Sequence, residues 1–334
     1  MLARTSKIKH PLGFTLETPV LIPSFSSKGF GFNKDDNSEI NKLWIIASEF
    51  LTETTLLSAY DLYYSHIKNI EEAIPEIFFV DSGGYEISNE HDLSTIYNDS
   101  PPPKEWSEDK LKETFDSWPS HRSAVFVSFD HPKMHKSLDE QIESAQSLFS
   151  NYPKQLNTLL VKPETGTQKY IQRQNVIANI DKLQVFDIIG FTEKELGNSV
   201  LDRMNAIATI RMAMDEEGMA APIHVYGSLD PITSVLYFLS GAELFDGLTW
   251  LRYGYSKGVA CYVHNYGVAH IGIDRRSDFV VAKTMRDNLS YLIDLSNQMK
   301  TFLLEKDFTV FDDNAEIFRK SYNLLRTKNT RVQL

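Results

Sequence analysis

Short apolar runs recur along this chain, and helical spacing of apolar residues separates most of them. The runs that predict strands are 18–25, 43–47, 77–80, 124–129, 159–161, 185–189, 223–226 and 242–245. The stretches that predict helices are 52–67, 107–118, 138–149, 200–214, 231–239, 279–304 and 314–325. Strands that alternate with helices favour a parallel sheet joined by right-handed crossovers.

A sheet of about eight such strands can close on itself, so the predicted fold class is α/β, a (β/α)8 TIM barrel. We expect one catalytic domain over residues 1–334, with the barrel over about 18–275 and C-terminal helices over about 279–325. The polar stretch 89–106 predicts a surface loop, and an insertion is expected near 89–120. The main alternative is an open doubly wound sheet, but the chain lacks the G-x-G-x-x-G turn typical of that fold.

Several predicted strands end on a polar residue or a glycine, and in a barrel these ends surround one mouth. The residues at these ends are Asp81, Asp130, Lys162, Gly190, Gly227 and Asp246. Three carboxylates on one rim repel one another, which raises the pKa of at least one unless a ligand or a cation compensates. Taken singly, Asp246 is also explained as a residue that caps a turn, and Asp130 as a helix N-cap.

The segment Asp81-Ser82-Gly83-Gly84-Tyr85 is the most informative of these loops. Two glycines allow the backbone to approach a flat ligand and leave N–H groups free to donate. Tyr85 offers a ring for stacking, and Asp130 could accept hydrogen bonds from the adjacent donors of a guanine-like base. We therefore predict a base-binding loop, with a simple tight turn as the alternative.

Charge, cysteine content and apolar runs limit the kinds of protein that could carry this site. The formal net charge of −11 argues against a protein that coats nucleic acid, but not against an enzyme with a local basic groove. Cys261 is the single cysteine, and its spacing to His264 and His270 fits no strong zinc pattern, so we predict no metal and no cofactor. No apolar run approaches the ~18 residues of a membrane span, and no signal peptide is evident, so we expect a cytoplasmic protein that does not bind membranes.

Taken together, these motifs resemble those of the tRNA-guanine transglycosylase family, which includes queuine and archaeosine transglycosylases. The matching positions are 81–85 for the family's D-S-G-G-[FY] loop, 128–130 for its F-D-E segment, Tyr226, Gly227 and Pro231 for its M-G-x-G-x-P segment, and 244–246 with Arg252 for its M-F-D-C-V-x-P-T-R segment. The matches follow the family's order and cover about residues 21–255.

The resemblance implies a barrel that exchanges guanine in nucleic acid for a 7-deazaguanine base such as preQ0, through a covalent Asp-sugar intermediate. It implies Asp246 as the nucleophile that attacks C1′ of the sugar, and Asp81 as the acid/base group for the two bases. The base-binding residues that it implies are Ser82, Gly84, Tyr85, Asp130, Lys162, Gly190, Tyr226 and Gly227, with Tyr85 and Tyr226 on the two faces of the ring, Gly190 at its edge, and Arg252 on the nucleic-acid backbone. Exchange with retention needs two displacements, for which a carboxylate nucleophile and a separate proton carrier suffice.

The chain also departs from the family's pattern. The family's C-x-C-x-x-C…H zinc site lacks its ligands, because Cys261 is the single cysteine. Lys162 stands where the family has the glutamine of its V-Q-G-G segment. The zinc subdomain helps to position tRNA in the relatives, and divergent members of the family insert 7-deazaguanines into DNA. A DNA transglycosylase is therefore favoured over a tRNA-modifying enzyme of the queuosine type.

Other interpretations stay open at this point. A catalytically silent family member would act as a partner subunit or a base-binding module, and a barrel enzyme could act on a free nucleoside. The expected partners are nucleic acid, either DNA or tRNA, and a 7-deazaguanine base. Relatives often dimerise, so a homodimer and a partner subunit are both left open.

Overall fold

Eight parallel strands close into a barrel in the computed structural model, which describes residues 2–32, 38–88 and 102–332. The strands are β3 (Val20–Phe25), β4 (Thr54–Ser58), β5 (Ile77–Asp81), β6 (Ser123–Val127), β7 (Leu156–Val161), β8 (Ile188–Thr192), β9 (Ile223–Tyr226) and β10 (Leu244–Gly247). They follow one another around the barrel in chain order, and β10 pairs with β3 to close it. The predicted (β/α)8 barrel is therefore confirmed.

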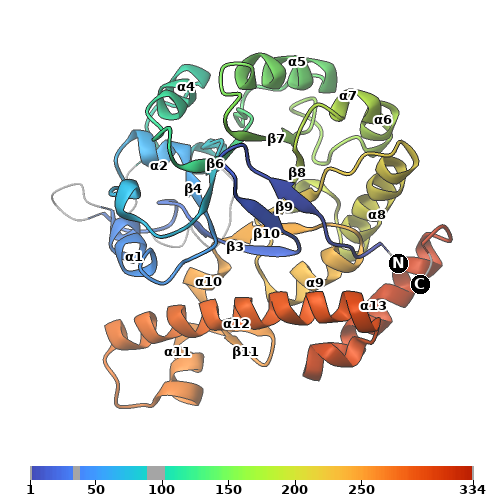
Figure 1. Ribbon diagram of the computed structural model, residues 1–334. Coiled ribbons are helices and arrows are strands. Elements are labelled where there is room, and N and C mark those ends of the chain that lie inside the picture. The colour runs from blue at the N-terminus through green and yellow to red at the C-terminus, as the bar shows by residue number, and fades with distance from the viewer. Residues whose placement is uncertain (1, 33–37, 89–101, 333–334) are drawn as a thin grey trace.

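Helices surround the barrel (Figure 1). Those before β10 are α1 (Glu39–Ala47), α2 (Ala59–Tyr63), α3 (Gly84–Ile87), α4 (Glu108–Asp116), α5 (Leu138–Phe149), α6 (Arg173–Ala178), α7 (Ile180–Leu183), α8 (Val200–Glu216) and α9 (Pro231–Leu239). Those after it are α10 (Thr249–Arg252), α11 (Val263–Tyr266), α12 (Ser277–Glu305) and α13 (Ala315–Lys328). The other helical segments, which are 3₁₀- or π-helical, are η1 (Ile70–Glu72), η3 (Glu193–Glu195), η4 (Gly267–Ile271) and η5 (Phe308–Asn314). Within the described ranges, no helix combines the length and the apolar character needed to cross a membrane.

A short N-terminal hairpin fills the amino end of the barrel. It consists of β1 (Lys7–Lys9) and β2 (Thr15–Glu17), which pair antiparallel. Ile8 and Leu16 of this hairpin join the apolar cluster formed by the interior side chains of the barrel. A ring nitrogen of His10 lies 3.1 Å from the carbonyl oxygen of Ala124, near the start of β6. Figure 1 shows this dark-blue segment crossing the barrel, so the carboxyl ends of the strands form the open mouth.

The second barrel strand lies in a different segment from the one predicted. Residues 43–47, predicted as a strand, belong to helix α1, whose N-cap Ser38 accepts a hydrogen bond from the N–H of Ile40. The run looks continuous because it includes Ile45 and Ile46, but both are exposed, at 44% and 45%. The strand is β4, inside the stretch predicted as a helix, where all five side chains of T-T-L-L-S are buried. A parallel strand covered on both faces loses the alternation that usually reveals it.

Other predicted boundaries also change. The strand predicted at 185–189 begins at Ile188, so Gly190 lies inside β8 and not after it. Helix α4 lies between β5 and β6, within the stretch near 89–120 where an insertion is expected. Residues 89–101 of the predicted surface loop lie outside the described residues, and Trp106 at its end is buried.

The long helix α12 fixes the segment that follows β10. An antiparallel hairpin, β11 (Tyr253–Ser256) with β12 (Val259–Tyr262), comes directly after α10. The fully buried Asn288 of α12 donates to the carbonyl oxygens of Trp250 at 2.7 Å and Tyr253 at 2.6 Å. Its own side-chain oxygen accepts from the N–H of Tyr255 at 2.8 Å. One asparagine therefore holds the chain just beyond the predicted nucleophile.

Candidate functional site

A cavity of about 1170 Å³ opens at the carboxyl ends of the barrel strands. All site residues predicted from the sequence except Gly190 line it: Asp81, Ser82, Gly84, Tyr85, Asp130, Lys162, Tyr226, Gly227, Asp246 and Arg252. They belong to β5, β9 and β10 or to segments that directly follow barrel strands. The structure thus brings three carboxyls from distant parts of the chain to one mouth, where (β/α)8 barrels hold their ligands.

Three donors hold the carboxylate of Asp246 at the end of β10. The hydroxyl of Ser24 donates to Oδ2 at 2.8 Å, and the backbone N–H of Gly227 donates to Oδ1 at 3.3 Å. Nε2 of His224 lies 3.1 Å from the same Oδ1. Asp246 is only 5% exposed. Its side chain is therefore fixed in one orientation on the cavity wall, as a preorganised reactive group must be.

His224 is a site residue that the sequence analysis missed. Its ring is fully buried and stacks on the ring of Tyr226, with centroids 3.8 Å apart and an interplanar angle of 25°. Alternate residues of a strand point to the same side, so a histidine two residues before a mouth tyrosine faces the barrel interior with it. That spacing was the available sequence signal. The contact means that one face of the Tyr226 ring is covered by His224.

The Asp81 carboxyl lies in surroundings that disfavour its charged form. Burial raises the pKa of Asp81 well above its ordinary value of 3.8, and the carboxyls of Glu86, Asp130 and Asp246 raise it further. A hydrogen bond with the backbone of Ser82 acts in the opposite direction but is the smallest contribution. A carboxyl that keeps its proton towards neutral pH can serve as a general acid.

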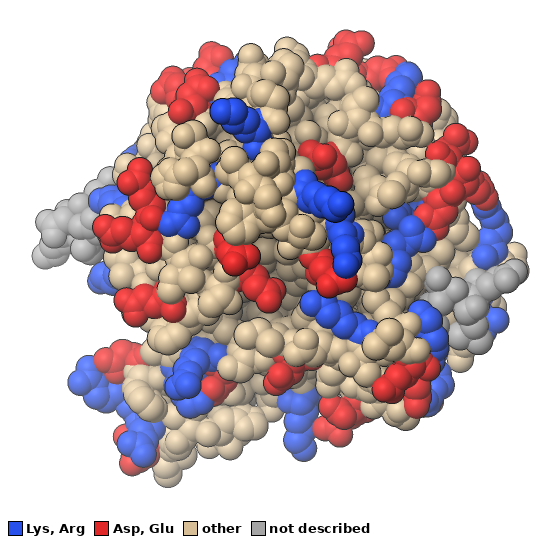
Figure 2. Space-filling view, viewed as in Figure 1, with Lys and Arg blue, Asp and Glu red and all other residues tan. Residues whose placement is uncertain are grey.

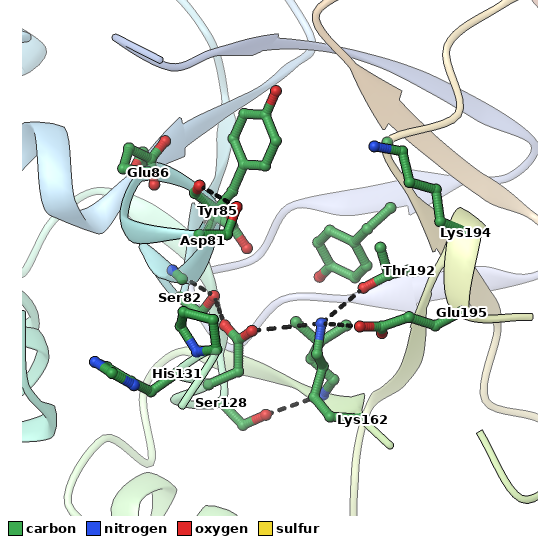
Figure 3. Close-up of a pocket in the computed structure, with 18 of the residues that line it drawn as sticks. Asp81, Ser82, Tyr85, Glu86, Ser128, His131, Lys162, Thr192, Lys194 and Glu195 are labelled. Atoms are coloured by element: carbon green, nitrogen blue, oxygen red, sulfur yellow. Dashed lines mark hydrogen bonds and ion pairs between the residues drawn. The ribbon is translucent and has the colours of Figure 1, made fainter. Parts of the chain in front are cut away.

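Glu86 is a second buried carboxyl that the sequence analysis missed. It lines the same cavity and accepts a hydrogen bond from the hydroxyl of Ser26. Burial, followed by the charge of Asp61, raises the pKa of Glu86 to about 7. Figure 3 shows Glu86 and Asp81 on the same side of the pocket. Because Glu86 is the largest electrostatic contribution to the raised pKa of Asp81, its protonation influences the predicted acid/base group.

Asp130 and Lys162 belong to a charged network, and Figure 3 shows its members Lys162, Thr192 and Glu195 across the pocket from Glu86. The hydroxyl of Ser82 donates to Asp130 Oδ1, and Lys162 Nζ lies 3.5 Å from Asp130 Oδ2. The same ammonium lies 2.8 Å from Glu195 Oε1 and 3.1 Å from the hydroxyl of Thr192. Glu195 was not predicted, because it follows its strand by several residues. The network places a cation between two carboxylates, which offsets part of their repulsion.

Close packing explains both glycines of the loop after β5. A Cβ on Gly84 would lie 2.4 Å from Asp130 Oδ1, so a side chain there would displace that carboxylate. Gly83 has a φ of +78°, and a Cβ on it would lie 2.7 Å from the ring of Trp106. The indole N–H of Trp106 also donates to the carbonyl oxygen of Ser82 at 2.9 Å. Trp106 was expected in a surface loop, but it supports this loop from inside.

Lys28, in the loop after β3, holds Tyr85. Its ammonium donates to the carbonyl oxygens of Tyr85 at 2.8 Å and Ser88 at 2.9 Å, and to the Ser88 hydroxyl at 2.6 Å. The same Nζ lies 4.3 Å from the centroid of the Tyr85 ring, within the range of a cation–π contact. Arg252 donates from Nη2 to the carbonyl oxygen of Lys28 at 2.9 Å. Arg252 therefore supports the loop that orients Tyr85, whatever else it binds.

Gly190 lies beneath the Tyr226 ring and not on the cavity wall. A Cβ at this position would lie 2.5 Å from Cε2 of Tyr226 and 3.1 Å from Cγ2 of Thr158. Glycine in β8 thus leaves the space that the tyrosine ring occupies. Its connection with the site runs through Tyr226, and the predicted position at the edge of a bound base does not follow from this geometry.

The residues considered for a metal site are engaged in separate contacts. The thiol of Cys261 donates to the carbonyl oxygen of Gly254, and Nε2 of His270 lies 2.8 Å from the hydroxyl of Ser256. Across residues 2–32, 38–88 and 102–332, no group of three or more His, Cys, Asp or Glu side chains is arranged to hold a metal ion.

No protein-family model matches this sequence, and no curated protein matches it either.

Proposed function

We propose that this protein is a guanine transglycosylase, which replaces a guanine in nucleic acid by a 7-deazaguanine base such as preQ0. The observation that carries the proposal is a pair of carboxyls with opposite surroundings in one cavity. Asp246 is held by three donors, whereas burial and neighbouring carboxyls raise the pKa of Asp81. A fixed nucleophile and a separate carboxyl whose surroundings favour its protonated form suit a two-step base exchange.

In the first displacement, a carboxylate oxygen of Asp246 attacks C1′ of the target nucleoside. The bond from C1′ to N9 breaks, and its electron pair stays with the departing guanine. Asp81 gives its proton to that base, so guanine leaves as a neutral molecule. The sugar is then joined to Asp246 through a new C1′–O bond.

In the second displacement, the ionised Asp81 takes the proton from N9 of the incoming base, and this nitrogen attacks C1′. The C1′–O bond breaks and returns its electron pair to Asp246. Two inversions restore the original configuration at C1′. Asp81 ends in the protonated form that its surroundings favour, so the cycle is complete without any other proton donor.

The remaining cavity residues suit a flat, guanine-like ring. Asp130 can accept from the adjacent N–H donors at one edge of the base, and the ammonium of Lys162 can donate to its oxo group. Tyr85 and Tyr226 both line the cavity, where their rings can contact a flat base, and His224 supports the Tyr226 ring as Lys28 supports the Tyr85 ring. Taking a base out of its stack costs a few kcal/mol, and aromatic stacking in the pocket offsets this cost.

DNA is the favoured polymer, with tRNA as the alternative. The resemblance to the transglycosylase family includes the base-handling motifs but not the cysteines of the zinc subdomain, which helps to position tRNA in the relatives. Cys261 alone cannot replace that ligand set. A substrate held differently from tRNA fits this combination, as in the divergent members of the family that modify DNA.

The test is incorporation of labelled guanine and labelled preQ0 by the purified full-length chain. Duplex DNA, single-stranded DNA, tRNA and free guanosine or deoxyguanosine are offered separately, and label in the polymer or nucleoside is counted. Label in DNA supports the proposal, and label in tRNA alone moves it to the tRNA enzyme. Label in free nucleosides alone indicates a nucleoside enzyme, and bound base without exchange into any acceptor indicates a silent base-binding module.

Asp130→Ala is expected to weaken binding of guanine about 10- to 100-fold, because a charge-assisted pair of hydrogen bonds to the base is lost. Isothermal titration with the free base measures the effect. Asp139→Ala, which removes an exposed carboxylate from α5, is the matched control and should bind guanine like the wild type. Unchanged affinity in Asp130→Ala would show that this carboxylate does not read the base.

Lys28→Met is expected to raise the KM for the base about three- to tenfold and to change kcat much less, because Tyr85 loses the contacts that orient its ring. Steady-state base exchange gives both constants. If Lys28 acts through Tyr85, the substitution has no further effect in a Tyr85→Ala background. Additive losses in the double variant would mean that the two residues act independently.

A further inference from the structure

The loops that follow β6, β7 and β8 touch one another and form one continuous wall of the cavity mouth. His135, after β6, packs so closely on Gly166, after β7, that a Cβ there would lie 3.3 Å from its Nε2. The hydroxyl of Tyr170, after β7, donates to the side-chain oxygen of Asn198, after β8, at 3.0 Å. A ligand that lies along this wall would meet all three loops.

Each of these loops places a lysine on that wall. Lys136 follows β6, Lys169 follows β7 and Lys194 follows β8, and all three line the cavity. His131 and His135 line it as well, and the segment 131–136, H-P-K-M-H-K, contains no acidic residue. Figure 3 shows Lys194 across the pocket from Tyr85. We call Lys136, Lys169 and Lys194 the basic rim.

The acidic residues of the same loops are engaged within the protein. Glu164 accepts from the N–H of Leu138 at 3.1 Å and from Nδ2 of Asn175 at 2.7 Å. Glu193 lies 2.9 Å from Arg203. Their charges are thus held by internal partners, as those of Glu195 and Asp130 are by Lys162. The lysines also make contacts within the protein: Lys136 Nζ donates to the hydroxyl of Ser144 at 2.9 Å, and Lys169 Nζ lies 5.7 Å from the centroid of the Tyr170 ring. These two partners are uncharged, so they leave the positive charge of each lysine in place.

This arrangement differs from that on the face crossed by the N-terminal hairpin. The chain as a whole has a formal net charge of −11. On the face crossed by the N-terminal hairpin, Lys and Arg alternate with Asp and Glu, and neither sign dominates (Figure 2). A cationic arc at the entrance of an acidic cavity, on an acidic protein, attracts a polyanion to that entrance in particular.

We propose that the basic rim binds the phosphodiester backbone of the nucleic-acid strand whose base enters the cavity. This inference rests on the proposed function and assigns the backbone contacts to residues that no family motif includes. Three cations on three consecutive loops suit successive phosphates of one strand, whereas a single phosphate would engage one loop. Such contacts set affinity and register and carry no base specificity.

The experiment compares the wild type with Lys136→Gln/Lys169→Gln/Lys194→Gln by fluorescence anisotropy of labelled DNA and RNA oligonucleotides over a series of salt concentrations. The rim triple is expected to bind roughly tenfold more weakly at low salt. The slope of log Kd against log salt is expected to fall by about 2, since each phosphate contact contributes about 0.7 on a single strand. Guanosine monophosphate serves as a probe with one phosphate.

The matched control is Lys7→Gln/Lys306→Gln/Lys320→Gln, which removes the same charge from exposed sites on β1, the end of α12 and α13. Equal slopes in the two triples would overturn the rim assignment, while base exchange by the wild type would leave the proposed function standing. An equal loss for guanosine monophosphate would also overturn it, in favour of a mononucleotide site. If the wild type bound neither DNA nor RNA, the proposed function itself would fail.

Discussion

Replacing Asp246 by asparagine is expected to lower the rate of base exchange by about 10⁴-fold or more, because the reaction loses its nucleophile. Asparagine has nearly the same shape, and its single side-chain oxygen can still accept from the N–H of Gly227 while its amide N–H donates to the hydroxyl oxygen of Ser24, so the pocket should keep its form. The measurement is incorporation of labelled guanine into DNA, together with mass spectrometry of the protein after denaturation. The wild type should show a covalent sugar adduct and the variant should show none.

Two companion variants make the result specific. Ser24→Ala removes one donor to the carboxylate and should cost far less activity than loss of the nucleophile. Asp116→Asn, on α4 away from the cavity, should behave like the wild type. If Asp246→Asn still formed a covalent sugar adduct, the nucleophile would have to be another residue. Normal binding of the free base by the variant would show that it is folded.

The barrel could be predicted because its evidence is distributed over the whole chain. Apolar runs and amphipathic stretches alternate, and closure follows from their number, so one misplaced strand did not change the architecture. The strand at 43–47 was misplaced because two exposed isoleucines on α1 resemble a strand when only local apolarity is read. The true strand β4 was missed because burial on both faces removes its alternation.

The candidate site was predictable to the extent that its residues stand at strand ends. Asp81, Asp130 and Asp246 each follow an apolar run, and a closed barrel brings such ends together whatever lies between them. No motif marks the residues that control them. His224 is an interior residue of a strand, Glu86 lies in a four-residue helix, and Trp106 lies in a polar loop. Their roles depend on contacts across the barrel, which sequence spacing does not encode.

The geometry also separates three carboxyls that look alike in the sequence. Asp246 is surrounded by donors, Asp130 shares Lys162 with Glu195, and Asp81 has no cation among the causes that set its pKa. Groups of one type acquire different roles when their surroundings differ in this way. The assignment of nucleophile, base reader and proton carrier therefore rests on the partners of each carboxyl and not on the motif that contains it.

Asp81→Asn is expected to lower the rate of base exchange by about 10²- to 10⁴-fold, because the departing guanine no longer receives a proton. In the wild type, kcat should fall as the pH rises through the raised pKa of Asp81, since only the protonated form can donate. The pH profile of kcat for transfer to DNA measures this fall, which forms the alkaline limb of the profile. Glu86→Gln removes the largest electrostatic contribution to that pKa, so it should move the limb to lower pH. If the alkaline limb stayed at the same pH in Glu86→Gln and was still present in Asp81→Asn, a group other than Asp81 would donate the proton to the departing base.

Asp81→Asn should also stabilise the folded protein. A carboxyl that is kept for function can cost stability, whereas a carboxyl that supports the fold cannot be removed without loss of stability. A carboxyl whose pKa is higher in the folded state ionises more readily when unfolded, so the wild type loses stability as the pH rises above about 3.8 and until it passes the raised value. Asparagine does not ionise and is free of that loss. Thermal unfolding of the two proteins should therefore coincide near pH 3 and diverge in favour of Asp81→Asn towards neutral pH. If Asp81→Asn were less stable than the wild type at pH 7, the Asp81 carboxyl would stabilise the fold, and its raised pKa would not cost stability.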